Sequence, residues 1–157
     1  MKLKHFIIAM PTALLVFGSC VAIAKTVNEA GVLVCVNDKW QEKELEKGHK
    51  LVDYAGRCVG VPDDPKAEKY SEDCVGKYEY MPDKSWKGSG TCTRTHTGGD
   101  KSYDTFEESS QLKEYPYKVT GGTGKFQGAS GGGTYAYESM AADTLFGGRY
   151  KGKVKLH

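Results

Sequence analysis

Past its first 24 residues, the sequence has no isoleucine and few other aliphatic side chains. All three isoleucines lie within residues 1–23, and residues 25–157 hold ten valines and six leucines. This is thin for a hydrophobic core, so aromatic rings must supply much of the buried apolar surface. All ten tyrosines lie in this part of the chain, and each buried tyrosine needs a partner for its hydroxyl. The composition fits a small barrel with a partly polar interior.

The sequence also lacks a charge excess and the usual metal-binding spacings. Its net charge is +2 at pH 7, and the two surplus cations, Lys2 and Lys4, precede residue 25. The rest of the chain is formally neutral, which argues against nucleic acid or an anionic membrane surface as a partner. The cysteines show no C-x-x-C spacing, and His49, His96 and His157 are scattered. We therefore expect no metal site.

Nucleotide-binding motifs fail on spacing. Gln127 stands where a G-x-G-x-x-G fingerprint beginning at Gly122 needs its third glycine. In a Walker loop, Ser or Thr follows the Gly-Lys pair, but Phe126 follows Gly124-Lys125 here. A Ser/His/Asp set is not discernible either, because His96 is the only histidine in a strand expected to face the interior. The sequence predicts neither a phosphate loop nor a hydrolase triad.

Residues 1–24 have the order of a secretory signal peptide. Lys2 and Lys4 precede an apolar run over residues 6–17, and Ala22-Ile23-Ala24 follows. The run is too short to cross a bilayer as a helix, so no membrane span is expected. We predict cleavage after residue 24, and a single secreted or periplasmic domain over residues 25–157. Lipoprotein processing with acylation of Cys20 is the less favoured alternative, because Phe17 stands where an aliphatic residue is usual.

Four cysteines remain after export, and an even number in an oxidising compartment predicts disulfide bonds. A hairpin folded about residues 82–84 sets Cys74 opposite Cys92 or its neighbour. We predict Cys74–Cys92, which leaves Cys35–Cys58. Pairing of Cys58 with Cys74 is the alternative.

Two-residue alternation of apolar and polar side chains predicts β-strands along residues 25–157. A continuous apolar run predicts a buried strand over residues 31–36. The charged residues 37–50 that follow are expected to form a solvated loop or one short helix. Further strands are expected over residues 49–61, 74–81, 85–96, 117–121, 134–137 and 145–156.

A glycine-rich bend joins two of these strands within residues 117–137. The run Gly121-Gly122-Thr123-Gly124-Lys125-Phe126-Gln127-Gly128-Ala129, followed by a Gly-Thr-Tyr strand, resembles the signature of allene oxide cyclase-like and dirigent-like barrel proteins and of their small secreted bacterial relatives. The resemblance implies an eight-stranded antiparallel closed barrel with a central cavity. Plant members of the family use that cavity on small hydrophobic or phenolic molecules without a cofactor. The signature marks the fold rather than the chemistry, and it carries over no catalytic residue.

The two central hairpins predict a candidate ligand site. Gly98-Gly99 is a two-residue turn signal, and its register would set Tyr103 across from Arg94 and Glu107 across from Gly90. Rings with a few convergent polar groups, around glycines that leave space, are typical of a small-molecule pocket. The candidate ligand-binding residues are Tyr78, Tyr80, Trp86, Arg94, Tyr103 and Glu107. A one-residue slip would exchange Tyr103 and Glu107 for Asp104 and Phe106.

Three functions remain open at this point. The preferred one is a secreted module that binds a small hydrophobic or aromatic molecule in the barrel. The second is a cofactor-independent isomerase or cyclase in which Glu107 or Arg94 steers a reactive intermediate. The third is a structural or interaction protein of the cell envelope, in which these residues form a packed core and Arg94 and Glu107 an ordinary ion pair. No cofactor is expected, and a homo-oligomer is left open.

Overall fold

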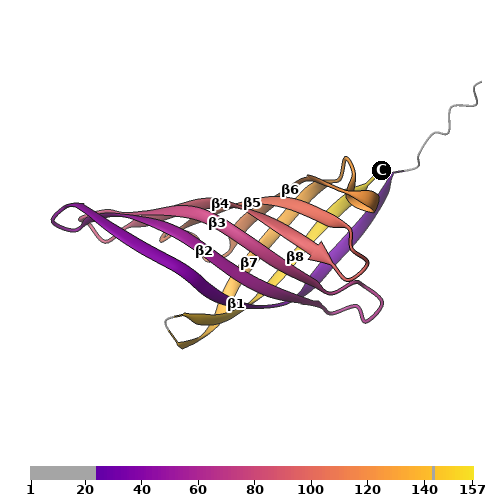
Figure 1. Ribbon diagram of the computed structural model, residues 1–157, viewed down its shortest axis with the longest axis horizontal. Helices are drawn as coiled ribbons and strands as arrows, with labels where there is room; N and C mark the ends of the chain where they lie inside the picture. The colour runs from indigo at the N-terminus through magenta and orange to yellow at the C-terminus, as the bar shows by residue number, and fades with distance from the viewer. Residues whose placement is uncertain (1–23, 143) are drawn as a thin grey trace, which may run out of the picture.

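Eight antiparallel strands close into a barrel in chain order, and β1 completes the ring by pairing with β8 (Figure 1). The structure is a computed structural model that describes residues 24–142 and 144–157. The closed eight-stranded barrel confirms the fold class expected from the sequence. Its elements are β1 (Lys25–Glu46), β2 (His49–Pro62), β3 (Tyr70–Tyr80), β4 (Trp86–His96), β5 (Lys101–Ser109), β6 (Tyr115–Gly122), the 3-10 helix η1 (Gly124–Phe126), β7 (Ser130–Ala142) and β8 (Leu145–Leu156).

Side-chain burial alternates along the strands, as a two-residue period requires. On β5, Ser102, Asp104, Phe106 and Glu108 are buried, whereas their neighbours are at least partly exposed. The apolar run over residues 31–36 follows the same rule, so its prediction as a buried strand is correct for one face only: Leu33 and Cys35 are buried, while Val34 and Val36 are exposed. Each strand thus has one face in the barrel interior.

The long strand β1 corrects the loop or helix expected over residues 37–50. It continues to Glu46 and pairs with β2 along this whole stretch. Its pairing with β8 ends at Val36, so the last part of β1 is a sheet edge. Residues 38–46 are all exposed, and their charges leave no apolar face that would reveal the strand period. The β1–β2 hairpin therefore extends beyond the closed part of the barrel (Figure 1).

The turn between β4 and β5 corrects the expected register. The His96 N–H donates to the Asp100 carbonyl, which encloses three residues rather than two. Gly99 has a φ of 91° there, as the last residue of a three-residue hairpin loop often does. Arg94 consequently lies opposite Ser102 instead of Tyr103, and Ser89 lies opposite Glu107. The one-residue shift turns the expected inner face of β5 outward.

The two disulfides have the predicted pairing. Cys35 is bonded to Cys58 across β1 and β2, and Cys74 to Cys92 across β3 and β4. Such bonds are typical of an oxidising compartment. Within the described residues, no helix has the length and apolarity to cross a membrane. The signal peptide and the acylation of Cys20 concern residues almost wholly outside the described part of the chain, and they stay predictions.

Aromatic rings occupy the space that side chains would fill at inward-facing glycines. A Cβ on Gly88 would lie 2.2 Å from the ring of Tyr78, and one on Gly90 would lie 2.5 Å from the ring of Phe106. Ring-on-glycine packing fills the middle of the barrel, so the expectation that these glycines leave room for a ligand is wrong. Any ligand must bind where this packing ends.

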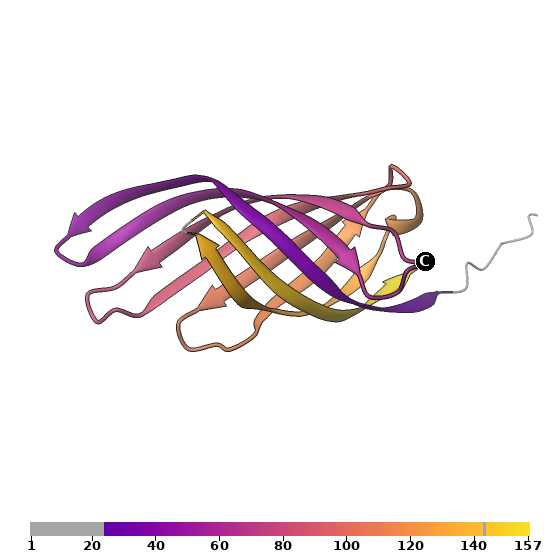
Figure 2. The same ribbon diagram turned by 90° about the horizontal axis from the view of Figure 1, so that it is seen from below.

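The two ends of the barrel differ. At one end, hairpins β1–β2, β3–β4 and β5–β6 project as separate loops (Figure 2). At the other end, near the C-terminus, η1 follows β6, and the ring of its Phe126 stacks on His96 with centroids 4.2 Å apart. The first end is open and the second is closed by side chains.

Candidate functional site: an aromatic cup

A cavity of about 660 Å³ lies at the open end of the barrel. All eight strands contribute to its lining, so the closed sheet itself fixes the positions of the lining side chains. We call this cavity the cup. The residues that line it are Asn37, Asp38, Trp40, Tyr54, Tyr78, Tyr80, Trp86, Glu108, Tyr115, Tyr137, Thr144 and Phe146.

Aromatic rings in contact with one another form most of the cup wall, from Trp40 on β1 round to Phe146 on β8. The ring of Trp86 packs between Tyr80 and Tyr115, with centroid distances of 6.3 and 6.1 Å. The ring centroids of Trp40 and Tyr78 are 5.3 Å apart, and Trp40 stays 40% exposed at the mouth of the cup. Each ring is held by its neighbours and presents apolar surface to the cavity, which suits stacking against a flat molecule.

Glu108 lies at the floor of the cup and is 5% exposed. Tyr78 donates its hydroxyl hydrogen to Oε2 at 2.9 Å, and Tyr137 donates to Oε1 at 2.6 Å. Tyr135 also donates to Oε1. A carboxylate offers about four acceptor positions, so one remains on Oε2. Across the described residues, the polar contacts of Glu108 are these three neutral hydroxyls.

The tyrosines around Glu108 are held in their protonated form. Burial raises the pKa of Tyr78, Tyr135 and Tyr137 far above 10, and the negative charge of Glu108 raises it further. Both effects oppose a phenolate beside a carboxylate in a poorly hydrated site. These hydroxyls therefore remain hydrogen-bond donors over the physiological pH range.

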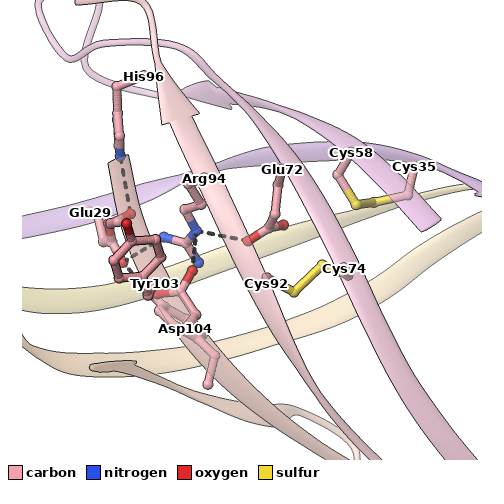
Figure 3. Close-up of polar contacts among 12 residues, drawn as sticks. Glu29, Cys35, Cys58, Glu72, Cys74, Cys92, Arg94, His96, Tyr103 and Asp104 are labelled. Carbon is pink, nitrogen blue, oxygen red and sulfur yellow. Dashed lines mark hydrogen bonds and ion pairs between the residues drawn. A yellow bond between two sulfur atoms is a disulfide. The ribbon is translucent and has the colours of Figure 1, made fainter. Parts of the chain in front are cut away.

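A second polar cluster is centred on Arg94 (Figure 3). It lies deeper in the barrel than the cup, because Asp104 precedes Glu108 on the inner face of β5 and does not line the cup. The Arg94 Nε lies 2.8 Å from Glu72 Oε1 and 2.8 Å from Asp104 Oδ2. One terminal nitrogen lies 3.4 Å from Glu29, which also accepts the hydroxyl of Tyr117. We call Arg94, Glu29, Glu72 and Asp104 the arginine cluster.

Three carboxylates facing one guanidinium make this cluster acidic. Burial raises the pKa of Asp104 to about 7; Arg94 opposes the shift, and the charges of Glu72 and Glu29 add to it. The rings of Tyr70 and Tyr117 lie 5.0 and 4.9 Å from the Arg94 guanidinium carbon. The guanidinium is thus enclosed on all of these sides and is not offered to a ligand.

An inner void of about 50 Å³ separates the two sites. Both disulfides, the arginine cluster residues Glu72, Arg94 and Asp104, and Glu108 contribute to its lining. A void of this size has room for a water molecule or two and none for an aromatic ring. An organic ligand is therefore confined to the cup.

Only half of the predicted site residues line the cup. Tyr78, Tyr80 and Trp86 line the cup. Arg94 is buried in the cluster below, and the expected Arg94–Glu107 pair is wrong because Glu107 faces outward. Tyr103 also lies on the outer face and is 39% exposed.

Sequence reasoning missed Glu108, Trp40, Tyr54, Tyr115 and Tyr137. For Glu108 the signal was present: once the loop after His96 has three residues, Glu108 takes the inward place that had been given to Glu107. Alternate tyrosines at 78 and 80, 115 and 117, and 135 and 137 also mark an aromatic inner face.

The closed end of the barrel brings together a serine, a histidine and a glutamate. The His96 Nε2 lies 3.1 Å from Ser102 Oγ, and its Nδ1 lies 4.0 Å from Glu68. Ser102 is only 3% exposed, which leaves no approach for a substrate. Burial, and then the charge of Arg94, lower the pKa of His96 to about 4. This group seals the end of the barrel and has no accessible nucleophile.

Comparison with known proteins supports the fold and goes no further. No protein-family model matches the chain, and no curated protein matches it. The barrel is similar to the structure of the pterocarpan synthase dirigent protein GePTS1, with a TM-score of 0.59 and 12% identity over 85% of this chain and 92% of that chain. The pterocarpan synthase dirigent protein PsPTS1 gives a TM-score of 0.55 and 11% identity over 85% of this chain and 96% of that chain. The dirigent-like barrel implied by the glycine-rich signature is confirmed at the level of fold.

Proposed function

We propose that this protein is an exported binding module that holds a small, flat aromatic molecule in the cup. The observation that carries the proposal is an open cavity of about 660 Å³ with aromatic walls and a single buried carboxylate at its floor. Its volume lies within the usual range of small-molecule sites. The two disulfides support a place of action outside the cytoplasm.

Two features would hold such a ligand. The rings of Trp40, Trp86 and Tyr80 offer stacking surface, and burial of apolar area there drives association. The remaining acceptor position on Glu108 orients a donor group of the ligand toward the floor. Together they select flat molecules that carry a donor at one end.

The two other functions lack comparable support. An isomerase or cyclase that uses Glu107 or Arg94 has neither group in the cup, since Glu107 faces outward and Arg94 is enclosed by carboxylates. A purely structural role would suit a packed interior, whereas the packing here stops short of the open end. The similarity to dirigent proteins described as pterocarpan synthases agrees with a small-molecule ligand.

Calorimetric titration with a flat ligand and its saturated counterpart tests the proposal. We expect 2-naphthol to bind with a defined stoichiometry and decahydro-2-naphthol to bind at least tenfold more weakly. The variant Trp86→Ala should weaken the binding of 2-naphthol, whereas Tyr103→Ala, on the outer face, should not. Equal affinities for the two compounds, or equal effects of the two variants, would exclude the cup as an aromatic site.

A further inference from the structure

We infer that the ligand of the cup is a cation, an aromatic or alkylated ammonium compound. The inference rests on the proposed function, because it specifies the chemical class of ligand for the same cavity. It depends on the charges that line the cup and on how each of them is balanced.

Among the described residues that line the cup there are two acids and no lysine, arginine or histidine. Asp38 is already balanced, because Arg57 donates to both of its oxygens at 2.7 and 2.8 Å. Glu108 is held only by tyrosine hydroxyls. Lys50, near the rim on β2, is paired with Glu42 at 2.9 Å and is not directed to the floor. The cup therefore has one negative charge without a counter-charge.

The negative charge of Glu108 reaches the cup walls. Burial raises the pKa of Tyr54, Tyr80 and Tyr115, and the next cause for each is the charge of Glu108. These tyrosines come from three different strands, β2, β3 and β6. A field that disfavours a second negative charge at these three tyrosines favours a positive charge in the space between them.

The walls themselves suit a cation. The face of an aromatic ring carries partial negative charge, and an organic cation within about 6 Å of a ring centre is attracted to it, most strongly by tryptophan. Both tryptophans of the chain, Trp40 and Trp86, line the cup beside tyrosines. Aromatic cages of this composition are the usual protein sites for quaternary ammonium groups. A neutral phenol would use the rings and leave the charge of Glu108 unbalanced.

The test compares ligands of one shape and different charge. Phenyltrimethylammonium and tert-butylbenzene are shape-matched, 4-tert-butylphenol adds a neutral donor, and 4-tert-butylbenzoate adds a negative charge. Because both tryptophans line the cup, tryptophan fluorescence excited near 295 nm reports binding of all four. We expect the cation to bind at least tenfold more tightly than tert-butylbenzene, and the benzoate to bind most weakly.

Glu108→Gln provides the decisive variant, since it removes the charge and keeps an acceptor oxygen for the tyrosines. In this variant the preference for the cation should fall to within about threefold. Glu107→Gln is the matched control, one residue away on the outer face, and should keep the full preference. Thermal melting of both variants verifies that each is folded.

The outcomes separate the two proposals. Binding of tert-butylbenzene or 4-tert-butylphenol as tight as that of the cation overturns the inference and leaves an aromatic binding site intact. A preference for the cation that survives Glu108→Gln also overturns it. Absence of saturable binding for all four compounds would instead contradict the proposed function.

Discussion

Arg94 and Glu108 lie on neighbouring strands, both point into the barrel, and they are balanced in opposite ways. Arg94 meets three carboxylates and two aromatic rings. Glu108 meets three neutral hydroxyls and an open cavity. A buried charge that is fully paired inside the protein belongs to the fold, whereas one that faces a cavity without a counter-charge is available to a ligand. We therefore assign the arginine cluster to the stability of the fold and Glu108, at the floor of the cup, to ligand binding.

The largest expected effect comes from removing the cation of the arginine cluster. Arg94→Met should lower the free energy of unfolding by about 3–5 kcal/mol, because it leaves buried carboxylates without a partner. Urea unfolding of the oxidised protein measures this. Arg57→Met, which breaks an exposed ion pair at the cup rim, is the control and should change little. Comparable losses in both variants would contradict a structural role specific to Arg94.

The disulfide Cys74–Cys92 joins the strands that carry Glu72 and Arg94. Replacing both cysteines with alanine should cost about 3 kcal/mol, chiefly because the unfolded chain regains the freedom of the closed loop. Affinity for a cup ligand should stay within about twofold at a temperature where the variant is folded. Loss of binding in a folded variant would mean that ligand binding in the cup depends on the structure around the arginine cluster.

The pH dependence of stability distinguishes Asp104 from His96. Burial raises the pKa of Asp104 from 3.8 to about 7, so the stability due to its bound proton is present below pH 4 and lost as pH rises through 7. The pKa of His96 falls from 6.5 to about 4, so its contribution has the opposite sign: it is lost as pH falls through that range.

Asp104→Asn removes the first contribution and keeps the second. Between pH 4.5 and 7.5, the free energy of unfolding of the wild type relative to this variant should fall by about 2 kcal/mol. One pKa unit corresponds to about 1.4 kcal/mol, and changes in the protonation of the neighbouring carboxylates offset part of the full shift. Urea unfolding at the two pH values measures the difference. If the free energy of unfolding changes equally with pH in the two proteins, the pKa of Asp104 is not raised.

The sequence is sufficient for the fold and for part of the cup. Alternation, turn residues and cysteine spacing locate most strands and both disulfides, because these signals act over a few residues. They fail over residues 38–46, where both faces of the strand are exposed and its two apolar side chains, Trp40 and Leu45, do not share a strand face.

The site depends on register, which the sequence left undecided by one residue. Gly98-Gly99 fits a two-residue or a three-residue loop, and the choice decides which of two adjacent glutamates faces inward. Glu107 and Glu108 are chemically identical, so composition cannot tell them apart. Closure of the barrel makes the choice, because only one register buries Phe106 against Gly90.

The smallest expected effect completes the comparison. Glu108→Gln should change the free energy of unfolding by only about 1 kcal/mol, because the amide oxygen still accepts from tyrosines and no buried cation loses its partner. The same substitution should remove the preference for a cationic ligand. Urea unfolding beside that of Arg94→Met measures the contrast. A loss for Glu108→Gln as large as that for Arg94→Met would show that both charges stabilise the fold. A carboxylate whose role is to bind a ligand should contribute little to the stability of the ligand-free protein.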